Sequence, residues 1–193
     1  MIWTARGRVT AAVLATGLAL GAVSCSGDSE PEPAASPSAS APAPLQTTAR
    51  LGRVEGTVDR AQRARTVAAV SSVVDGWWDA AYVGGDYPRT DFSDAFPGFT
   101  PGAAKDAAAD LRLMSNAEIG ERVDAVTART RRVSVDVLGV KGRPVGATAR
   151  VRLAFTTSGE RKGRVTVTGV LRLTKTDAGW QVFAYDVSEG GAR

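Results

Sequence analysis

The hydrophobic and polar positions divide the chain into three regions. Residues 9–23 form an uncharged, mostly apolar run of 15 residues, and residues 26–49 are rich in Pro, Ser and Ala with Leu45 as the sole large aliphatic. Periodic patterns begin near Arg50. The first run is shorter than the roughly 20 apolar residues that a bilayer-spanning helix needs. The pattern predicts one folded domain over residues 50–193.

A long helix is predicted over residues 60–83, where apolar positions recur with helical spacing. Asp59 suits the N-cap, and Gly84-Gly85 suits the C-terminal end. Asp75 and Asp79 are expected on the solvent-exposed face. The predicted buried face comprises Val67, Val70, Val74, Trp77, Trp78, Ala81 and Tyr82.

A second helix is predicted over residues 101–115, because Thr100 offers a capping hydroxyl and Pro101 suits the first helical position. The aromatic residues of the preceding loop, residues 86–100, are expected to pack onto the domain. The inner face of this helix is assigned to Ala104, Ala107, Ala108, Leu111 and Met114.

From residue 122 onward the period changes to two, which is typical of strands. Four strands are predicted, with residues 50–57 as a further candidate for a short edge strand. Short connections imply antiparallel neighbours with one buried and one exposed face. On the last strand, Trp180, Val182 and Ala184 are assigned to the buried face and Tyr185 to the other. The four strands are residues 122–140, 146–157, 163–175 and 180–187.

The predicted fold class is therefore α+β, with N-terminal amphipathic helices packed on a curved antiparallel sheet of about four strands. The closing Gly179-Trp180-Gln181-Val182-Phe183 and the Trp-rich helix end, residues 74–78, resemble the nuclear transport factor 2-like superfamily. The loop over residues 86–102 resembles actinobacterial lipoproteins of unknown function. The resemblance implies a cone-like domain, a homodimer through the outer sheet face, and relatives that include isomerases, dehydratases and non-catalytic binding domains.

Residues 1–24 have the basic start, apolar run and small-residue end of a secretory signal peptide. The segment Ala22-Val23-Ser24-Cys25 resembles the lipobox of bacterial lipoproteins, with Ala22 where Leu is usual. The resemblance implies lipid on Cys25 and anchorage on the extracytoplasmic face of the cell membrane. The alternative is an ordinary signal peptide with an incidental cysteine. Residues 25–49 are then the lipidated cysteine and a disordered tether, because they lack the apolar residues that a core needs.

The amino-acid composition excludes several kinds of catalytic and metal-binding site. The chain has no His and one Cys, which excludes the usual Cys/His zinc sites, Ser-His-Asp and Cys-His catalysis, and an internal disulfide. Removal of Arg6 and Arg8 lowers the net charge from +4 to +2, too small to argue for nucleic acid. No cofactor or metal is expected, because the spacing of Asp86, Asp91 and Asp94 matches no calcium-binding loop.

Three groups of residues are candidate sites. The first group is catalytic, because some members of this superfamily use a carboxylate and a tyrosine in catalysis. No residue of this chain matches a catalytic motif of the superfamily. The carboxylates and tyrosines that could take these roles are Asp75, Asp79, Tyr82, Asp136, Tyr185 and Asp186. An apolar pocket, with core packing as its alternative, is formed by Trp77, Trp78, Tyr82, Phe96, Phe99 and Trp180. A basic stripe on the outer sheet face, with an ordinary solvated surface as its alternative, is formed by Arg132, Arg150, Arg152, Arg164 and Arg172.

These patterns favour a non-catalytic, membrane-tethered binding or accessory domain of the cell envelope. Its expected partners are the membrane through the lipid anchor, and a wall polymer, an anionic headgroup, a protein or an apolar small molecule. Two alternatives stay open: a small-ligand enzyme of the isomerase or dehydratase type with the same fold, and a structural envelope protein.

Overall fold

A computed structural model describes residues 45–191. The expected signal peptide, Cys25 and most of the expected tether lie outside the described residues. The strands are β1 (Thr48–Glu55), β2 (Ala125–Val140), β3 (Arg143–Ser158), β4 (Gly163–Thr176) and β5 (Gly179–Gly191). The helices are α1 (Arg60–Trp78), the π-helical turn η1 (Asp79–Val83), α2 (Pro101–Ala109), α3 (Leu111–Met114) and the 3-10 turn η2 (Gly120–Arg122).

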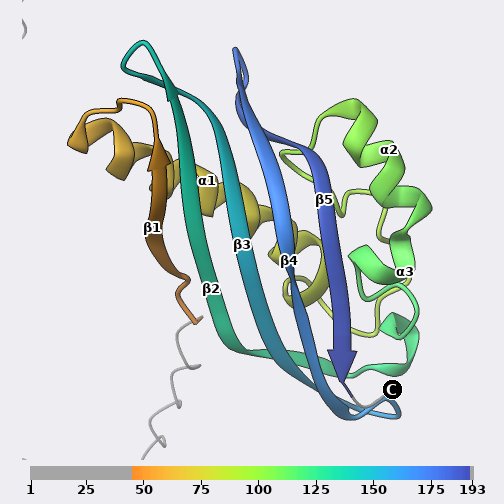
Figure 1. Cartoon of the computed structure of the whole chain (residues 1–193). Helices are drawn as coiled ribbons and strands as arrows, with labels where there is room; N and C mark the ends of the chain where they lie inside the picture. Colours follow the sequence, from red (N-terminus) through yellow and green to blue (C-terminus); the bar gives the residue numbers. More distant parts are fainter. Residues whose placement is uncertain (1–44, 192–193) are drawn as a thin grey trace, which may run out of the picture. The chain divides into compact units, whose positions relative to one another are not determined.

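The five strands form one open sheet in the order β1-β2-β3-β4-β5 (Figure 1). Strands β2 to β5 are an antiparallel meander joined by short hairpins, whereas β1 pairs with β2 in parallel. The α+β class, the helices packed on the sheet and the antiparallel meander are confirmed. Residues 50–57, the candidate for a short edge strand, correspond to β1, which lies at an edge of the sheet and begins at Thr48.

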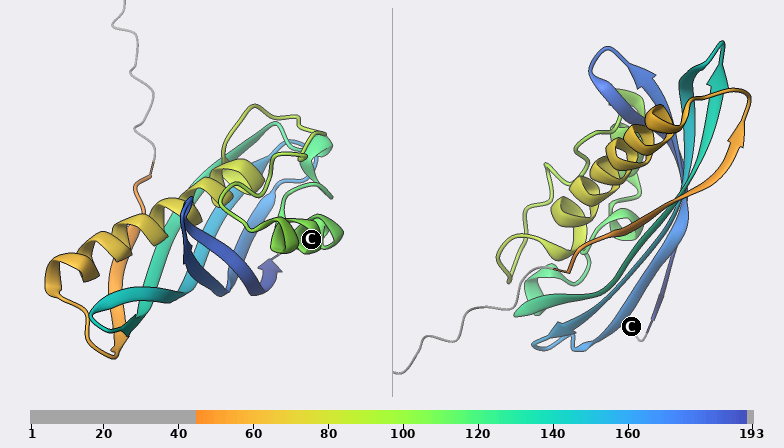
Figure 2. Two further views of the ribbon diagram at one scale, coloured as in Figure 1. Left: turned by 90° about the horizontal axis from the view of Figure 1, so that it is seen from above. Right: turned by 90° about the vertical axis from the view of Figure 1, so that its left-hand side faces the viewer.

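The predicted helix over residues 60–83 is confirmed as α1 continued by η1. The Asp59 carboxylate accepts a hydrogen bond from the backbone N–H of Gln62 at 2.9 Å, as an N-cap residue does. The predicted apolar face packs on the sheet, with Val67 half-buried and the others buried. Figure 2 shows that the helices lie on one side of the sheet, so its opposite face carries no helix.

The second predicted helix is divided in two at Asp110. Thr100 caps α2 as expected, since its hydroxyl accepts a hydrogen bond from the N–H of Ala103. Ala108, assigned to the inner face, is exposed, and this assignment was wrong. The physical reason is that α2 packs against β5, the strand at the edge of the sheet. It buries only Ala103 and Ala107 fully and Ala104 partly.

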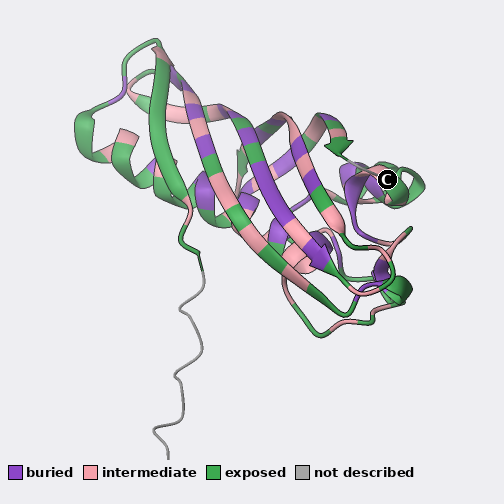
Figure 3. Cartoon of the chain, turned by 90° about the horizontal axis from the view of Figure 1, so that it is seen from below, coloured by how far each residue is buried: buried purple, intermediate pink, exposed green. Residues whose placement is uncertain are grey.

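Buried and exposed residues alternate along the strands (Figure 3). The buried side chains of β2 to β5 meet α1 and the loop before α2, where Phe92 and Phe99 are buried as expected. Within the described residues, no helix is long and apolar enough to cross a bilayer.

Two β-bulges change which side chains face the core. The register of β2 against β3 shifts between Ala128 and Thr130. After this shift Arg131 has the same orientation as the buried Val133 and points to the helix side. The register of β5 shifts beside Phe183, so that Tyr185 packs on the core and Ala184 lies opposite Arg172. The assignment of Ala184 inward and Tyr185 outward was therefore wrong, because strict alternation cannot anticipate an extra residue.

Candidate functional site

Arginines converge on the sheet face that the helices leave uncovered. The register places Arg132 of β2 directly opposite Arg152 of β3. Arg150 lies two residues from Arg152 on the same face, opposite Ser134. On the other side of Ser134, the parallel strand β1 places Arg50. Three adjacent strands thus bring four guanidinium groups to one region, which we call the basic face.

The basic face surrounds an open hollow of about 600 Å³. Its lining also includes the hydroxyl-bearing residues Thr48 and Ser134. An arginine presents its N–H groups as a planar fork that matches carboxylate and phosphate oxygens. The hollow therefore offers several anion-binding groups within reach of one extended ligand.

The charges of the basic face are only partly compensated within the protein. Arg150 forms an ion pair with Asp136, with Nη1 and Oδ2 2.7 Å apart, and the backbone N–H of Arg53 donates to Asp136 Oδ1 at 2.8 Å. Burial alone would raise the pKa of Asp136, but these two hydrogen bonds and the nearby positive charges hold it below its ordinary value. Asp136 therefore stays charged and neutralises Arg150. Among the described residues, Arg50, Arg132 and Arg152 have no ion-pair partner.

The direct pairing of Arg132 with Arg152 works against folding, because like charges on directly opposite strand positions repel. Sheet stability therefore does not explain this pair, whereas an anion bound between the two guanidinium groups removes the repulsion. On an ordinary solvated surface positive and negative side chains alternate, whereas here two arginines face each other.

Of the five arginines predicted to form a basic stripe, three lie together in the structure and two lie elsewhere on the sheet. Arg132, Arg150 and Arg152 come together, whereas Arg172 lies opposite Thr148 and lines a neighbouring hollow. Arg164 lies opposite Thr156, further along the sheet. Arg50 was missed, because its place depends on the parallel pairing of β1 with β2. The signal for it was the alternation of polar and apolar residues from Thr48 to Leu51.

The residues of the predicted apolar pocket fill the core. Trp77, Trp78 and Tyr82 are fully buried, and the Trp77 ring lies edge-on to Tyr82 at 5.6 Å and tilted to Phe99 at 6.2 Å. Phe96 packs on Phe99, and Trp180 is buried beneath Lys175. The main hollows of the described domain are lined by other residues. These positions support the alternative of core packing.

The candidate catalytic residues do not converge. The Tyr82 hydroxyl donates to the backbone oxygen of Leu113 at 2.7 Å inside the core, and the Tyr185 hydroxyl donates to Asp110 at 2.8 Å at the opposite edge of the sheet from β1. Asp136 belongs to the basic face, and Asp186 lies opposite Val170 on β4. No carboxylate and tyrosine of this set form a hydrogen-bonded pair among residues 45–191.

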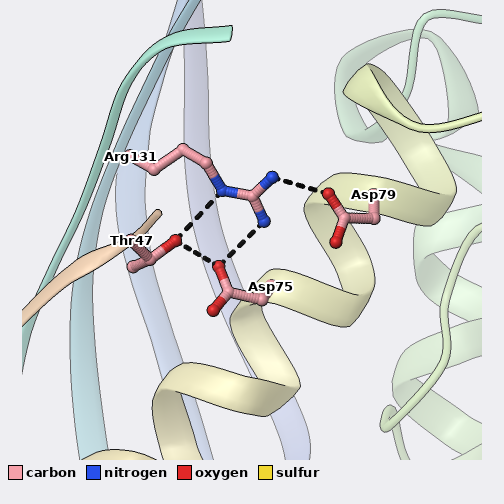
Figure 4. Close-up of polar contacts among 4 residues, drawn as sticks. All are labelled: Thr47, Asp75, Asp79 and Arg131. Atoms are coloured by element: carbon pink, nitrogen blue, oxygen red, sulfur yellow. Dashed lines mark hydrogen bonds and ion pairs between the residues drawn. The ribbon is translucent and has the colours of Figure 1, made fainter. Parts of the chain in front are cut away.

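Asp79 is exposed, as predicted, and Asp75 is half-buried, but both carboxylates form ion pairs. Arg131 Nη2 lies 2.9 Å from Asp75 Oδ1, and Arg131 Nη1 lies 2.6 Å from Asp79 Oδ1 (Figure 4). Arg131 Nε also donates to the hydroxyl of Thr47 at 3.0 Å, and that hydroxyl donates to Asp75. We call these four residues the Arg131 cluster. Arg131 faces α1 because it follows the same alternation as the buried Val133, Val135 and Val137 of β2.

The acidic residues of the loop before α2 serve local structure. Asp91 Oδ1 accepts the backbone N–H of Ser93 at 2.9 Å, and this bond is the main reason why the pKa of Asp91 lies below its ordinary value. Asp86 and Asp94 are exposed. In the part of the chain that the structure describes, no three acidic or cysteine residues are arranged to hold a metal ion.

Burial of Tyr82 gives a prediction for alkaline pH. Desolvation, followed by the negative charge of Glu189, raises the pKa of Tyr82 well above its ordinary value of 10.0. Folding thus favours the neutral phenol, so its contribution is complete below about pH 10 and is lost as pH rises further. Unfolding by urea is expected to show a fall in stability above about pH 10 that Tyr82→Phe reduces. Equal pH profiles for both proteins would refute this assignment.

Comparisons with known proteins identify no family. No protein-family model matches the sequence, and no curated protein sequence matches it. A solved structure from Novosphingobium aromaticivorans, described as a putative aromatic ring hydroxylase, aligns with 17% identity and a TM-score of 0.38. The alignment covers 69% of this chain and 93% of that one. At this level of similarity the match carries no argument about activity.

Proposed function

We propose that the protein is a non-catalytic binding domain of the cell envelope, tethered to the extracytoplasmic face of the membrane by lipid on Cys25, and that its basic face binds an anionic wall polymer. The observation that carries the proposal is a group of three arginines around one open hollow that have no ion-pair partner among residues 45–191, namely Arg50, Arg132 and Arg152. The signal-peptide pattern, the lipobox-like segment and the Pro/Ser/Ala-rich tether support the location.

The shape of the basic face favours a polymer over a small ligand. The guanidinium groups come from three neighbouring strands, which lie roughly 5 Å apart, and from positions two residues apart on β3, which adds about 7 Å along the strand. An anionic polymer contacts several of these groups at once, and each contact releases counterions. Binding is therefore expected to weaken steeply as salt is added.

We also propose that the domain is a member of the nuclear transport factor 2-like superfamily. The long helix on an open, mostly antiparallel sheet agrees with that superfamily at the level of architecture. The isomerase or dehydratase alternative has no specific observation in its favour, because its candidate carboxylates and tyrosines are engaged elsewhere.

The proposal predicts the effect of removing the facing arginines. Arg132→Ser/Arg152→Ser is expected to weaken binding to polyphosphate at least about tenfold and to reduce the slope of log K against log salt by about two. The measurement is isothermal titration calorimetry over a series of salt concentrations. Because the substitution removes a repulsive pair, the free energy of unfolding is expected to stay equal or to rise slightly.

The matched control is Arg161→Ser/Arg164→Ser, which removes the same charge near the β3–β4 hairpin. This variant is expected to retain most of the affinity and the salt slope. If both double variants lose affinity equally, binding depends on net charge alone and the proposed site is wrong. Lipidation is tested separately by mass spectrometry of the membrane fraction: an N-terminal peptide without lipid on Cys25 contradicts the anchor.

A further inference from the structure

Exposed apolar side chains are concentrated at one end of the sheet, next to the basic face. Six large apolar residues are exposed among those that the structure describes, and four of them lie at this end. Leu138, Val140 and Val145 belong to the β2–β3 hairpin, and Phe183 lies at the bulge of β5. Their exposed fractions are 49%, 49%, 39% and 50%, respectively. We call these four residues the hairpin patch.

The fold holds the hairpin patch in place. Lys141 and Gly142 have positive φ values of 50° and 80°, as a tight two-residue hairpin turn requires. Leu138 and Phe183 line one hollow of about 320 Å³, and Leu138 lies across from Gly146, the residue that follows Val145. The turn also bridges to Val58, next to the start of α1. The patch is therefore part of ordered structure.

Basic residues accompany the patch. Lys141 lies in the turn and Arg143 begins β3, and the sequence from Val137 to Ala149 contains no acidic residue. Arg53 and Arg172 line the neighbouring hollow together with Glu55 and Asp136, and Asp136 is engaged by Arg150 and by the backbone N–H of Arg53. Exposed apolar side chains next to lysine and arginine match the boundary of an anionic bilayer, where chains lie below the headgroups.

We propose that the β2–β3 hairpin is a docking site for the surface of an anionic phospholipid bilayer, with Val140 and Val145 inserted among the acyl chains and Lys141 and Arg143 among the headgroup phosphates. This contact uses other residues than the four arginines of the basic face. It depends on the proposed lipid attachment only because the attachment keeps the domain close to the bilayer. The patch is small, so the contact is weak in solution and is strengthened by the tether.

The length of the chain before the domain permits this contact. Thr48 pairs with Arg132, and Lys141 follows Arg132 by nine residues along the hairpin, a distance of about 30 Å in a strand. Residues 26–47 can span up to about 70 Å when extended. Lipid on Cys25 and the hairpin tip can therefore reach the same membrane.

The experiment uses the chain without residues 1–24, because the compact unit that carries the fold begins at Pro42. Cys25→Ser removes the native thiol. Since Cys25 is the sole cysteine, Val140→Cys then supplies one thiol for the polarity-sensitive fluorophore NBD. We expect a blue shift of NBD emission with vesicles of equal phosphatidylcholine and phosphatidylglycerol, and a smaller shift with phosphatidylcholine alone. The control, Ser158→Cys at the opposite end of the sheet, is expected to show no shift.

Vesicle co-sedimentation of the unlabelled chain separates the two contributions. Val140→Thr/Val145→Thr and Lys141→Glu/Arg143→Glu are each expected to weaken binding at least about fivefold. The control Arg161→Glu/Lys162→Glu, with the same change of charge on the β3–β4 hairpin, is expected to bind nearly as the parent chain does. Circular dichroism checks that the variants are folded.

Three results would overturn the proposal. The first is equal NBD shifts at the two ends, and the second is equal loss of binding in both charge-reversal variants. The third is a sedimentation coefficient of the parent chain that falls when the valines are replaced, because the patch would then join two copies of this chain. Loss of vesicle binding with intact polyphosphate binding would support the hairpin site and leave the basic face unaffected.

Discussion

Replacement of Trp77 by alanine is expected to lower the free energy of unfolding by about 4 kcal/mol, the typical cost of truncating a buried tryptophan. Trp77 is fully buried and lies among Trp78, Tyr82 and Phe99 at ring distances of 5.6 to 6.5 Å. Its indole N–H also donates to the backbone oxygen of Met114 at 3.1 Å. The substitution therefore leaves both a cavity and a buried carbonyl without its partner.

The measurement is equilibrium unfolding in urea, followed by far-ultraviolet circular dichroism so that loss of the tryptophan does not remove the signal. Because domains of this kind are stable by only about 5–15 kcal/mol, the variant is expected to be partly unfolded at moderate temperature. Phe183→Ala is the matched control, since this ring is half exposed and its loss is expected to change stability by less than about 0.5 kcal/mol. A similar effect of the two substitutions would contradict the assignment of Trp77 to the core.

The second large effect is expected at the Arg131 cluster. Arg131→Ala is expected to lower the free energy of unfolding by about 2 kcal/mol, somewhat less than for a fully buried pair because both carboxylates retain contact with water. Only 10% of the Arg131 side chain is exposed, against 30% for Asp75 and 54% for Asp79. Burial alone would lower the pKa of Arg131, but its hydrogen bonds to the two carboxylates raise it above the ordinary value. The arginine thus stays charged, and its removal leaves Asp75 and Asp79 uncompensated.

The control for Arg131 is its neighbour Arg129, which is exposed and donates one hydrogen bond to Thr156. Arg129→Ala is expected to cost less than about 0.5 kcal/mol. A double-mutant cycle with Asp75→Asn tests the mechanism, because Arg131→Ala is expected to cost less once the carboxylate is neutral. Strictly additive losses would show that the ion pair does not contribute.

The Arg131 cluster also connects the tether to the domain. Thr47 precedes β1 by one residue and joins the cluster through its hydroxyl. Loss of Arg131 is therefore expected to loosen β1 as well as α1, since β1 forms an edge of the sheet and pairs with β2 alone. The basic face includes Arg50 of the same strand, which links the stability of this edge to the proposed binding site.

Local patterns along the chain were sufficient to determine most of the architecture. Helical spacing with Asp59 and Gly84-Gly85 at its ends predicted α1 with η1, because capping and one-sided burial depend on residues that are close in sequence. Alternation and glycine turns predicted β2 to β5, because short connections force antiparallel neighbours. The absence of histidine excluded whole classes of catalytic and metal site before any fold was known.

Only the tertiary structure decided the features that depend on register. The bulge in β5 exchanged Ala184 for Tyr185 at the core, since one extra residue reverses every later side chain of a strand. Alternation with Val133 and Val135 places Arg131 on the inner face, but only the packing of α1 on the sheet brings it to Asp75 and Asp79. The parallel pairing of β1 with β2 brought Arg50 to Arg132 and Arg152. Such pairings join residues about 80 positions apart, as in Arg50 and Ser134, and periodicity within one segment carries no information about its partner.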